Sequence, residues 1–147
     1  MQPRDSETKV SVLVVENDET LREVLTTLIS RRGYQCESAE NGVEAMHKAT
    51  QSSFDAVVTD IDMPQMDGIA LTRSLTRRFP DLPVMIVTGR LDDSYMESAI
   101  TAGAREFLQK PFEISEFMMR LRRMLYKFTG QQGTRRGKVK SDEKSGD

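Results

Sequence analysis

The sequence is poor in the residues that cross-link a chain or carry redox chemistry. It has no tryptophan, one histidine and one cysteine among 147 residues. The cysteine, Cys36, cannot form an internal disulfide, so a reducing compartment is expected. We interpret Cys36 as a small buried hydrophobe rather than a redox sensor. The histidine, His47, falls on a predicted helix and is interpreted as a surface residue, not as a phosphodonor.

Long apolar runs and a large net charge are also missing. No stretch approaches the roughly 20 apolar residues of a membrane-spanning helix, and residues 1–9 lack the apolar core of a signal peptide. A net charge of −2 gives no reason to expect direct nucleic-acid binding. With 30% charged and 37% hydrophobic residues, the chain is expected to be a soluble cytoplasmic protein with no membrane association.

Short apolar runs alternate with segments of helical periodicity along most of the sequence. The runs are rich in β-branched residues and end at polar residues, glycine or proline, which is typical of buried strands. Strands are predicted over residues 10–15, 34–39, 54–60, 84–87 and 106–109, with a helix after each. This alternation predicts an α/β fold with a doubly wound, five-stranded parallel sheet and helices on both faces.

The ends of the chain differ in composition from its middle. The last predicted helix has the clearest period, from Ile114 to Phe128. Residues 1–9 are predicted to be an N-terminal extension and residues 10–128 a single folded domain. Residues 129–147 are rich in Gly, Ser, Gln, Lys and Arg and are expected to form a disordered tail, because they cannot bury enough apolar surface to offset their ordering entropy.

The stretch from Phe54 to Gly68 organises the prediction of function. Its apolar run ends at Asp60, which is therefore placed at the carboxyl end of a central buried strand. In open α/β sheets, ligands bind at that edge. Asp60 by itself could be only a cap at the end of a strand, so its meaning depends on the other residues expected at the same edge.

Four of the five predicted strands end in side chains that carry oxygen or an amine. They are Glu16-Asn17, Asp60, Thr88 and Lys110. Clustered oxygen ligands with one or two carboxylates suit Mg²⁺, and a nearby lysine and threonine suit a phosphoryl group. A carboxylate nucleophile such as Asp60 can accept phosphoryl as an aspartyl-phosphate. The residues therefore indicate metal-assisted phosphorylation of Asp60.

Four motifs in this order resemble the response-regulator receiver domain of two-component signalling, in its stand-alone, chemotaxis-regulator-like form. The resemblance covers about residues 10–128. It implies the strand order 2-1-3-4-5 and Mg²⁺-dependent phosphoryl transfer from the histidine of a sensor kinase to Asp60. The motifs are VLVVEND-E at 12–19, D-x-D-M-P-x-M-D-G at 60–68, VTG at 87–89 and F-x-x-K-P at 107–111.

The resemblance also implies a metal site. Glu16 and Asn17 occupy the positions of the acidic pair that holds the metal, together with Asp60 and the backbone carbonyl of Asp62. The second member of the pair normally binds the metal directly, and here it is Asn17. An amide oxygen can coordinate Mg²⁺ without adding charge, so weaker metal binding and slower phosphorylation are expected. A shifted pair, Asn17-Asp18, is disfavoured because it would bury Glu16 and because Asp18 is expected to point away from the pocket.

The remaining roles implied by the resemblance concern phosphate and output. Lys110 would pair with the phosphoryl oxygens and Thr88 would hydrogen-bond them. Thr88 and Phe107 would form the switch, although Phe107 can equally be read as a core aromatic. The output face would comprise the helix at residues 92–102, the fifth strand and the last helix. It would contact an unidentified downstream protein, and homodimerisation through the same face is left open.

Several competing functions are considered. The leading hypothesis is a phosphorylation-switched module, served by a sensor histidine kinase or a phosphotransfer protein, with no attached effector. The alternative is an atypical receiver that binds partners without phosphorylation because Asn17 has weakened the metal site. A haloacid-dehalogenase-type phosphatase would share the D-x-D pattern at Asp60-Ile61-Asp62, but this sequence has no later paired acids at a strand end. A flavodoxin-like flavin protein would need a phosphate loop after the first strand, and none is seen.

Overall fold

Five parallel strands form one sheet in the order β2-β1-β3-β4-β5 in the computed structural model, which describes residues 9–90 and 92–126. The strands are β1 Ser11–Val15, β2 Gln35–Ala39, β3 Ala56–Thr59, β4 Val84–Thr88 and β5 Glu106–Gln109. The helices are α2 Glu19–Arg31, α3 Gly42–Gln51, α4 Gly68–Arg78, α5 Asp93–Ala102 and α6 Ile114–Leu125. The predicted fold class and strand order are confirmed.

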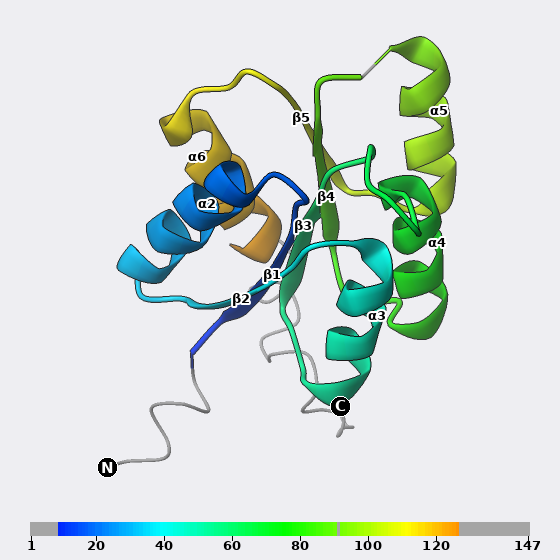
Figure 1. The fold of residues 1–147 in the computed structure, drawn as a ribbon. Coiled ribbons are helices and arrows are strands. Elements are labelled where there is room, and N and C mark those ends of the chain that lie inside the picture. The colour runs from blue at the N-terminus through cyan, green and yellow to red at the C-terminus, as the bar shows by residue number, and fades with distance from the viewer. Residues whose placement is uncertain (1–8, 91, 127–147) are drawn as a thin grey trace.

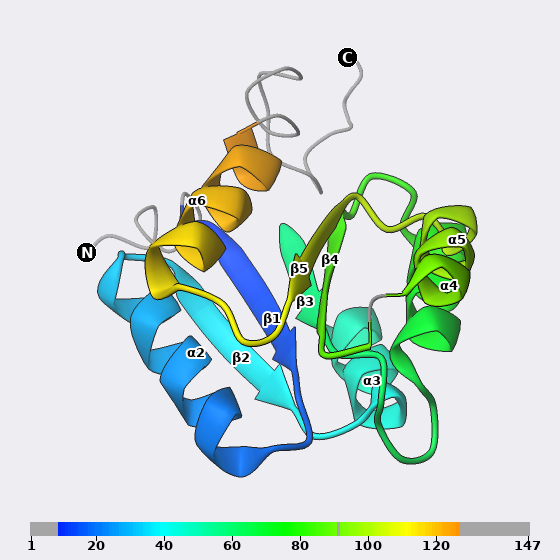
Figure 2. The same ribbon diagram turned by 90° about the horizontal axis from the view of Figure 1, so that it is seen from above.

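Helices cover both faces of the sheet. Figures 1 and 2 show α2 and α6 on one face and α3, α4 and α5 on the other. The residues of β1 alternate between two apolar clusters, because successive side chains of a strand point to opposite faces. Val12 and Val14 pack with residues of α2 and α6, whereas Leu13 and Val15 pack with residues of α3 and α4. Strand β1 is therefore buried on both sides, as its continuous apolar run predicts.

Side-chain caps fix where four of the helices begin. In each, an Asp or Asn oxygen accepts a hydrogen bond from a backbone N–H in the first turn, which satisfies a group that the helix leaves unpaired. The capping residues are Asp18 for α2, Asn41 for α3, Asp67 for α4 and Asp92 for α5. Three of these caps follow strands β1, β2 and β4 closely, so the chain turns back over the sheet within a few residues of the edge where the site lies.

The predicted boundaries differ from the observed ones in a few places. Strand β3 begins at Ala56 rather than at residue 54, and Thr88 is the last residue of β4. Ile114 is 44% exposed, so its assignment to the buried stripe of the last helix is wrong. Phe112, in the preceding loop, packs against Phe117 instead, with ring centroids 5.7 Å apart. Phe128, residues 1–8 and the predicted tail lie outside the described residues.

The loop after β3 folds back tightly on the residue that ends the strand. The N–H of Gly68 donates to the carbonyl of Ile61 at 2.9 Å. A Cβ placed on Gly68 would lie 1.8 Å from the carbonyl oxygen of Asp60. Only glycine therefore lets the start of α4 approach the backbone of Asp60 this closely.

This contact predicts the effect of a methyl group at two glycines beside the same edge. Gly68→Ala should lower the free energy of unfolding by about 2 kcal/mol or more, because the added Cβ must displace backbone. Gly89→Ala should change it by about 0.5 kcal/mol or less, since nothing lies within 4 Å of its Cβ position. Urea unfolding of both variants measures the difference. Equal effects would contradict the close approach at Asp60.

Candidate functional site

The carboxyl ends of four strands bring the predicted site residues to one edge of the sheet. Glu16 follows β1 and Asp60 follows β3, while Thr88 ends β4 and Lys110 follows β5. The parallel pairing of β1 with β3, of β3 with β4 and of β4 with β5 places these ends in neighbouring positions. Glu16 and Lys110 are 94 residues apart in the sequence, and the sheet topology brings them to the same edge.

A single ammonium group joins the two acidic residues of the site. The Nζ of Lys110 lies 2.9 Å from Oδ2 of Asp60 and 3.2 Å from Oε1 of Glu16. Glu16 is 3% exposed and Asp60 is 7% exposed, so both carboxylates are largely withdrawn from water. Buried carboxylates are tolerated only when they are paired and hydrogen-bonded. Lys110 supplies the charge that lets both of them occupy this edge.

Backbone groups hold the second oxygen of each carboxylate. Oδ1 of Asp60 accepts hydrogen bonds from the N–H groups of Ile61 at 2.6 Å and Asp62 at 3.4 Å. Oε2 of Glu16 accepts one from the N–H of Asp18 at 3.0 Å. Each carboxylate is thus fixed by its own loop on one side and by Lys110 on the other, which orients it before any ligand arrives.

Burial and charge perturb the two ionisable partners that face Asp60. Burial raises the pKa of Glu16 above its ordinary value and the negative charge of Asp60 adds to this, although the Asp18 N–H and the Lys110 charge act in the opposite direction. Burial acts to lower the pKa of Lys110, but hydrogen bonds and charge from Asp60 and Glu16 outweigh it and raise that pKa. Lys110 therefore stays charged at neutral pH.

Thr88 lies beside this triad and is connected to it through the backbone. Its side chain is fully buried, and its carbonyl accepts a hydrogen bond from the N–H of Lys110 at 2.9 Å. Its Oγ1 accepts another from the N–H of Arg90 at 3.2 Å. A hydroxyl that accepts one bond still has its own hydrogen to donate. Phe107 is half-buried on β5, packed on a cluster that includes Ile86.

The two remaining predicted residues, Asn17 and Asp62, are exposed. The carboxylate of Asp62 lies 3.4 Å from Arg90. Asp18 caps α2 through a hydrogen bond from the N–H of Leu21 at 3.1 Å, so its carboxylate is used outside the pocket as expected. Glu16 is nearly fully buried in this arrangement, so its burial does not distinguish the two possible acidic pairs, and the assignment of the pair to Glu16 and Asn17 stays a prediction.

Two arginines that the sequence analysis did not single out support the site. Arg22 donates from its guanidinium to the carbonyl of Glu16 at 2.8 Å, and Arg90 connects the loops that follow β3 and β4. The only sequence signal for either was a basic residue a few positions from the acidic or threonine motif. Such residues are common on exposed surfaces and are weak signals by themselves.

The donor chemistry of the site is compatible with Mg²⁺. Glu16 and Asp60 provide carboxylate oxygens, and Asn17 and the carbonyl of Asp62 would add neutral ones. No group of three or more His, Cys, Asp and Glu that could hold a metal ion is found in residues 9–90 and 92–126. Mg²⁺ usually keeps several waters and needs only one or two protein carboxylates. The donor set therefore fits a partly hydrated Mg²⁺ rather than an ion enclosed by protein.

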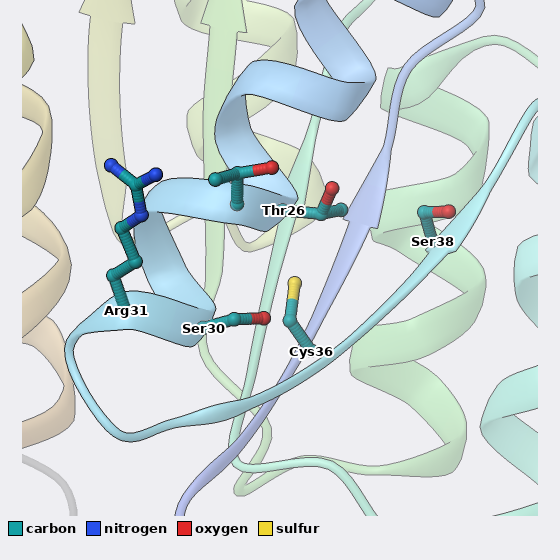
Figure 3. A pocket seen from close by; sticks show the side chains of 6 residues that line it. Thr26, Ser30, Arg31, Cys36 and Ser38 are labelled. Atoms are coloured by element: carbon teal, nitrogen blue, oxygen red, sulfur yellow. The ribbon is translucent and has the colours of Figure 1, made fainter.

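Cys36 lies away from this edge, in a shallow pocket between α2 and β2 (Figure 3). Burial, followed by the nearby charge of Glu37, raises the pKa of its thiol to about 12. The thiolate is the reactive form of cysteine, so a thiol that stays protonated at neutral pH reacts slowly. This supports the interpretation of Cys36 as a structural residue. The pocket is lined by Thr26, Thr27, Ser30, Arg31, Cys36 and Ser38.

Comparison with known proteins agrees with this geometry. Residues 12–122 match the response regulator receiver domain. The chain belongs to that family. It is a phosphoacceptor module of two-component signalling and not a conventional enzyme, and its fold is chemotaxis-regulator-like and flavodoxin-like. Membership of this family implies a cognate histidine kinase. The phosphatase and flavin-protein alternatives are thereby set aside.

Individual relatives place the receiver domain among longer regulators. Response regulator MprA of Mycobacterium sp. strain KMS is 37% identical over 124 residues, covering 84% of this chain and 54% of the relative. The chain thus spans about half the length of that relative. The non-phosphorylated HemR receiver domain of Leptospira biflexa is 32% identical with a TM-score of 0.75, covering 80% of this chain and 94% of that one.

A second solved structure, the Francisella response regulator 1452 receiver domain, is 26% identical with a TM-score of 0.75. The match covers 81% of this chain and 98% of that one. Within the described part of the chain, no helix has the length and apolar character needed to cross a membrane.

The shared ammonium predicts a pH-dependent effect of Lys110→Met. The variant should raise the pKa of Glu16 further, because burial and the Asp60 charge would act without the opposing cation. A carboxyl whose pKa is higher in the folded than in the unfolded chain stabilises the fold below its ordinary value, and this is lost as the pH rises through the raised value. The free energy of unfolding of Lys110→Met should therefore fall below that of the parent increasingly from about pH 4.5 towards neutrality.

Urea unfolding across this pH range measures the effect, and carbon-13 NMR of the Glu16 carboxyl reports its pKa directly. Lys48→Met is the control, because the ion pair of Lys48 with Glu44, at 3.8 Å, is partly exposed and contributes little. Lys48 also donates to the carbonyl of Ser38 at 2.6 Å, and the loss of that bond lowers stability to the same extent across the pH range. The control should follow the pH profile of the parent. Parallel profiles for the parent and Lys110→Met would contradict a shared, buried charge network.

Proposed function

We propose that Asp60 accepts a phosphoryl group from a phosphohistidine of a sensor kinase or a phosphotransfer protein. A carboxylate oxygen of Asp60 forms a bond to phosphorus while the phosphorus–nitrogen bond of the donor breaks, and the departing imidazole keeps the electron pair and takes up a proton. The observation that carries the proposal is the placement of Asp60 at a strand end, between Lys110 and Glu16, with its second oxygen held by backbone N–H groups. Charged and backbone donors aimed at developing negative charge are the main source of such catalysis.

Each neighbouring residue has a defined part in this proposal. Lys110, which stays charged, would form an ion pair with the phosphoryl oxygens, and Thr88 would donate its hydroxyl hydrogen to one of them. Glu16, Asn17, Asp60 and the carbonyl of Asp62 would hold Mg²⁺. When bound, this ion neutralises phosphoryl oxygens and helps orient them for transfer.

The output would pass through α5, β5 and α6, with Thr88 and Phe107 as the switch. Two of these elements carry exposed apolar side chains: Ile100 on α5 is 57% exposed and Met119 on α6 is 50% exposed. Exposed apolar residues suit contact with a protein partner. The partner would be a downstream protein or a second copy of the chain. We place the receiver domain at residues 10–128 and its site of action in the cytoplasm.

A second candidate function is supported by the chemistry of Asn17. In an atypical receiver, binding of partners would not depend on phosphorylation. Here Lys110 already pairs with both buried carboxylates and offsets part of their charge, and the neutral amide of Asn17 adds no charge to attract a metal. A site of this kind could remain in its resting state under physiological Mg²⁺.

Intact mass after incubation with acetyl phosphate distinguishes the two functions. A receiver that works through Asp60 should gain the mass of one phosphoryl group only when Mg²⁺ is present. Asp60→Ala should gain none, and Asp81→Asn, which changes an exposed acid away from the site, should behave like the parent. No gain at any Mg²⁺ concentration would refute phosphorylation of Asp60 and favour the atypical receiver.

The effect of Asn17 on the metal can be measured without phosphorylation. Asn17→Asp should raise the affinity for Mg²⁺ roughly tenfold in a calorimetric titration, because it adds a third carboxylate to the site. Asp18→Asn is the matched control. It changes charge at the next residue, keeps a good helix cap and points away from the pocket, so the affinity should stay near that of the parent. An unchanged affinity in Asn17→Asp would show that this position does not contact the metal.

A further inference from the structure

Arg90 lies in the loop after β4 and contacts both the loop after β3 and helix α5. Its backbone N–H donates to Oγ1 of Thr88 at 3.2 Å. Its guanidinium lies 3.4 Å from Oδ1 of Asp62, donates to the hydroxyl of Tyr95 and sits 4.5 Å from the centre of the Tyr95 ring. One side chain therefore contacts both the loop that follows Asp60 and the first turn of α5.

The Asp62 end of this connection lies at the phosphorylation site. The backbone N–H of Asp62 donates a hydrogen bond to Oδ1 of Asp60, the proposed phosphoryl acceptor, at 3.4 Å. The ion pair between Arg90 and Asp62 is about half exposed, with side chains 54% and 50% accessible. Exposed ion pairs are weak, so a stronger anion nearby can displace the carboxylate of Asp62 from the guanidinium.

The Tyr95 end lies on the proposed output face. Tyr95 is in the first turn of α5, where its N–H donates to Oδ1 of the capping residue Asp92 at 3.0 Å. Its half-buried ring packs on the apolar cluster that includes Ile86 and Ala99, and Phe107 packs on the same cluster. A change at the Tyr95 hydroxyl is thus transmitted to the start of α5 and to the surroundings of Phe107.

We propose that Arg90 is a latch that phosphorylation of Asp60 releases. In the unphosphorylated chain Asp62 and Tyr95 hold its guanidinium. A phosphoryl group on Asp60 adds negative charge next to Asp62 and offers oxygens that a planar guanidinium binds in a two-pronged manner. Arg90 then moves from Asp62 and Tyr95 towards the phosphoryl group, and the first turn of α5 is freed to change position.

This inference rests on the proposed phosphorylation of Asp60 and adds a second connection to the output face, which runs through the guanidinium of Arg90 beside the Thr88 and Phe107 switch. Phosphorylation can move Arg90 only to the extent that the phosphoryl group interacts more favourably with one position of the guanidinium than with the other. Because a weak exposed pair holds the closed position, losing it should shift the populations about fivefold. The open position is then appreciably populated even before phosphorylation when Arg90 loses a partner.

The ring signal of Tyr95 in NMR spectra of carbon-labelled tyrosine reports the latch. The chain has three tyrosines, and the spectrum of Tyr95→Phe identifies this one. In the unphosphorylated protein, Arg90→Gln and Asp62→Asn should both displace the signal in the direction that acetyl phosphate with Mg²⁺ produces in the parent. Arg90→Lys keeps the charge but not the planar group and should lie between. Arg31→Gln, on α2, should match the parent.

Intact mass of the same samples separates the two levels of the proposal. If the parent gains a phosphoryl group and the Tyr95 signal stays in place, the latch is overturned while the phosphorylation site stands. The latch is also overturned if Arg90→Gln leaves the unphosphorylated Tyr95 signal unchanged. If the parent gains no mass, the proposed function fails and the latch fails with it as a response to phosphorylation. Support requires displacement in both unphosphorylated variants and a smaller response of the Tyr95 signal to phosphorylation in Arg90→Gln than in the parent.

Discussion

The ammonium of Lys110, shared by Asp60 and Glu16, is the interaction on which the arrangement of the site depends. Two carboxylates that are 3% and 7% exposed repel one another and have lost most of their hydration. Lys110 is 50 residues from Asp60 and 94 from Glu16 along the chain, yet it lies within 3.2 Å of both. The site is therefore complete only when β5 has joined the sheet.

The strand order makes this contact possible. Strands β1 and β3 are neighbours although an entire strand and two helices separate them in sequence, and their carboxyl ends present Glu16 and Asp60 side by side. This is the point where the direction of strand addition reverses, the usual ligand site of open α/β sheets. Strand β4 lies between β3 and β5, and the carbonyl of Thr88 holds the N–H of Lys110, so that the lysine can reach back across the edge. The threonine is thus structural in the resting state as well as the proposed donor to phosphate.

The sequence predicts the parts of this structure that depend on periodicity and on strand ends. Buried apolar runs fix the strands, parallel pairing brings their carboxyl ends together, and Glu16, Asp60 and Lys110 were therefore expected to meet. What the sequence does not predict depends on side-chain direction in loops. Arg90 sits in a short loop, and nothing in its neighbours indicates that it contacts Asp62 and Tyr95 rather than water. Ile114 fits the helical period but falls at the first turn of α6, where Phe112 occupies the position over the core.

The most direct test of the shared ammonium is an NMR titration of Lys110 itself, followed through its labelled Cε. The pKa of Lys110 should lie above the ordinary lysine value of 10.5 in the parent, because hydrogen bonds and charge from Asp60 and Glu16 outweigh burial. It should be lower in the double variant Glu16→Gln, Asp60→Asn, where burial remains and both charges are gone. A Lys110 pKa at or below the ordinary value in the parent, or one that the double variant leaves unchanged, would show that the two carboxylates do not share this ammonium.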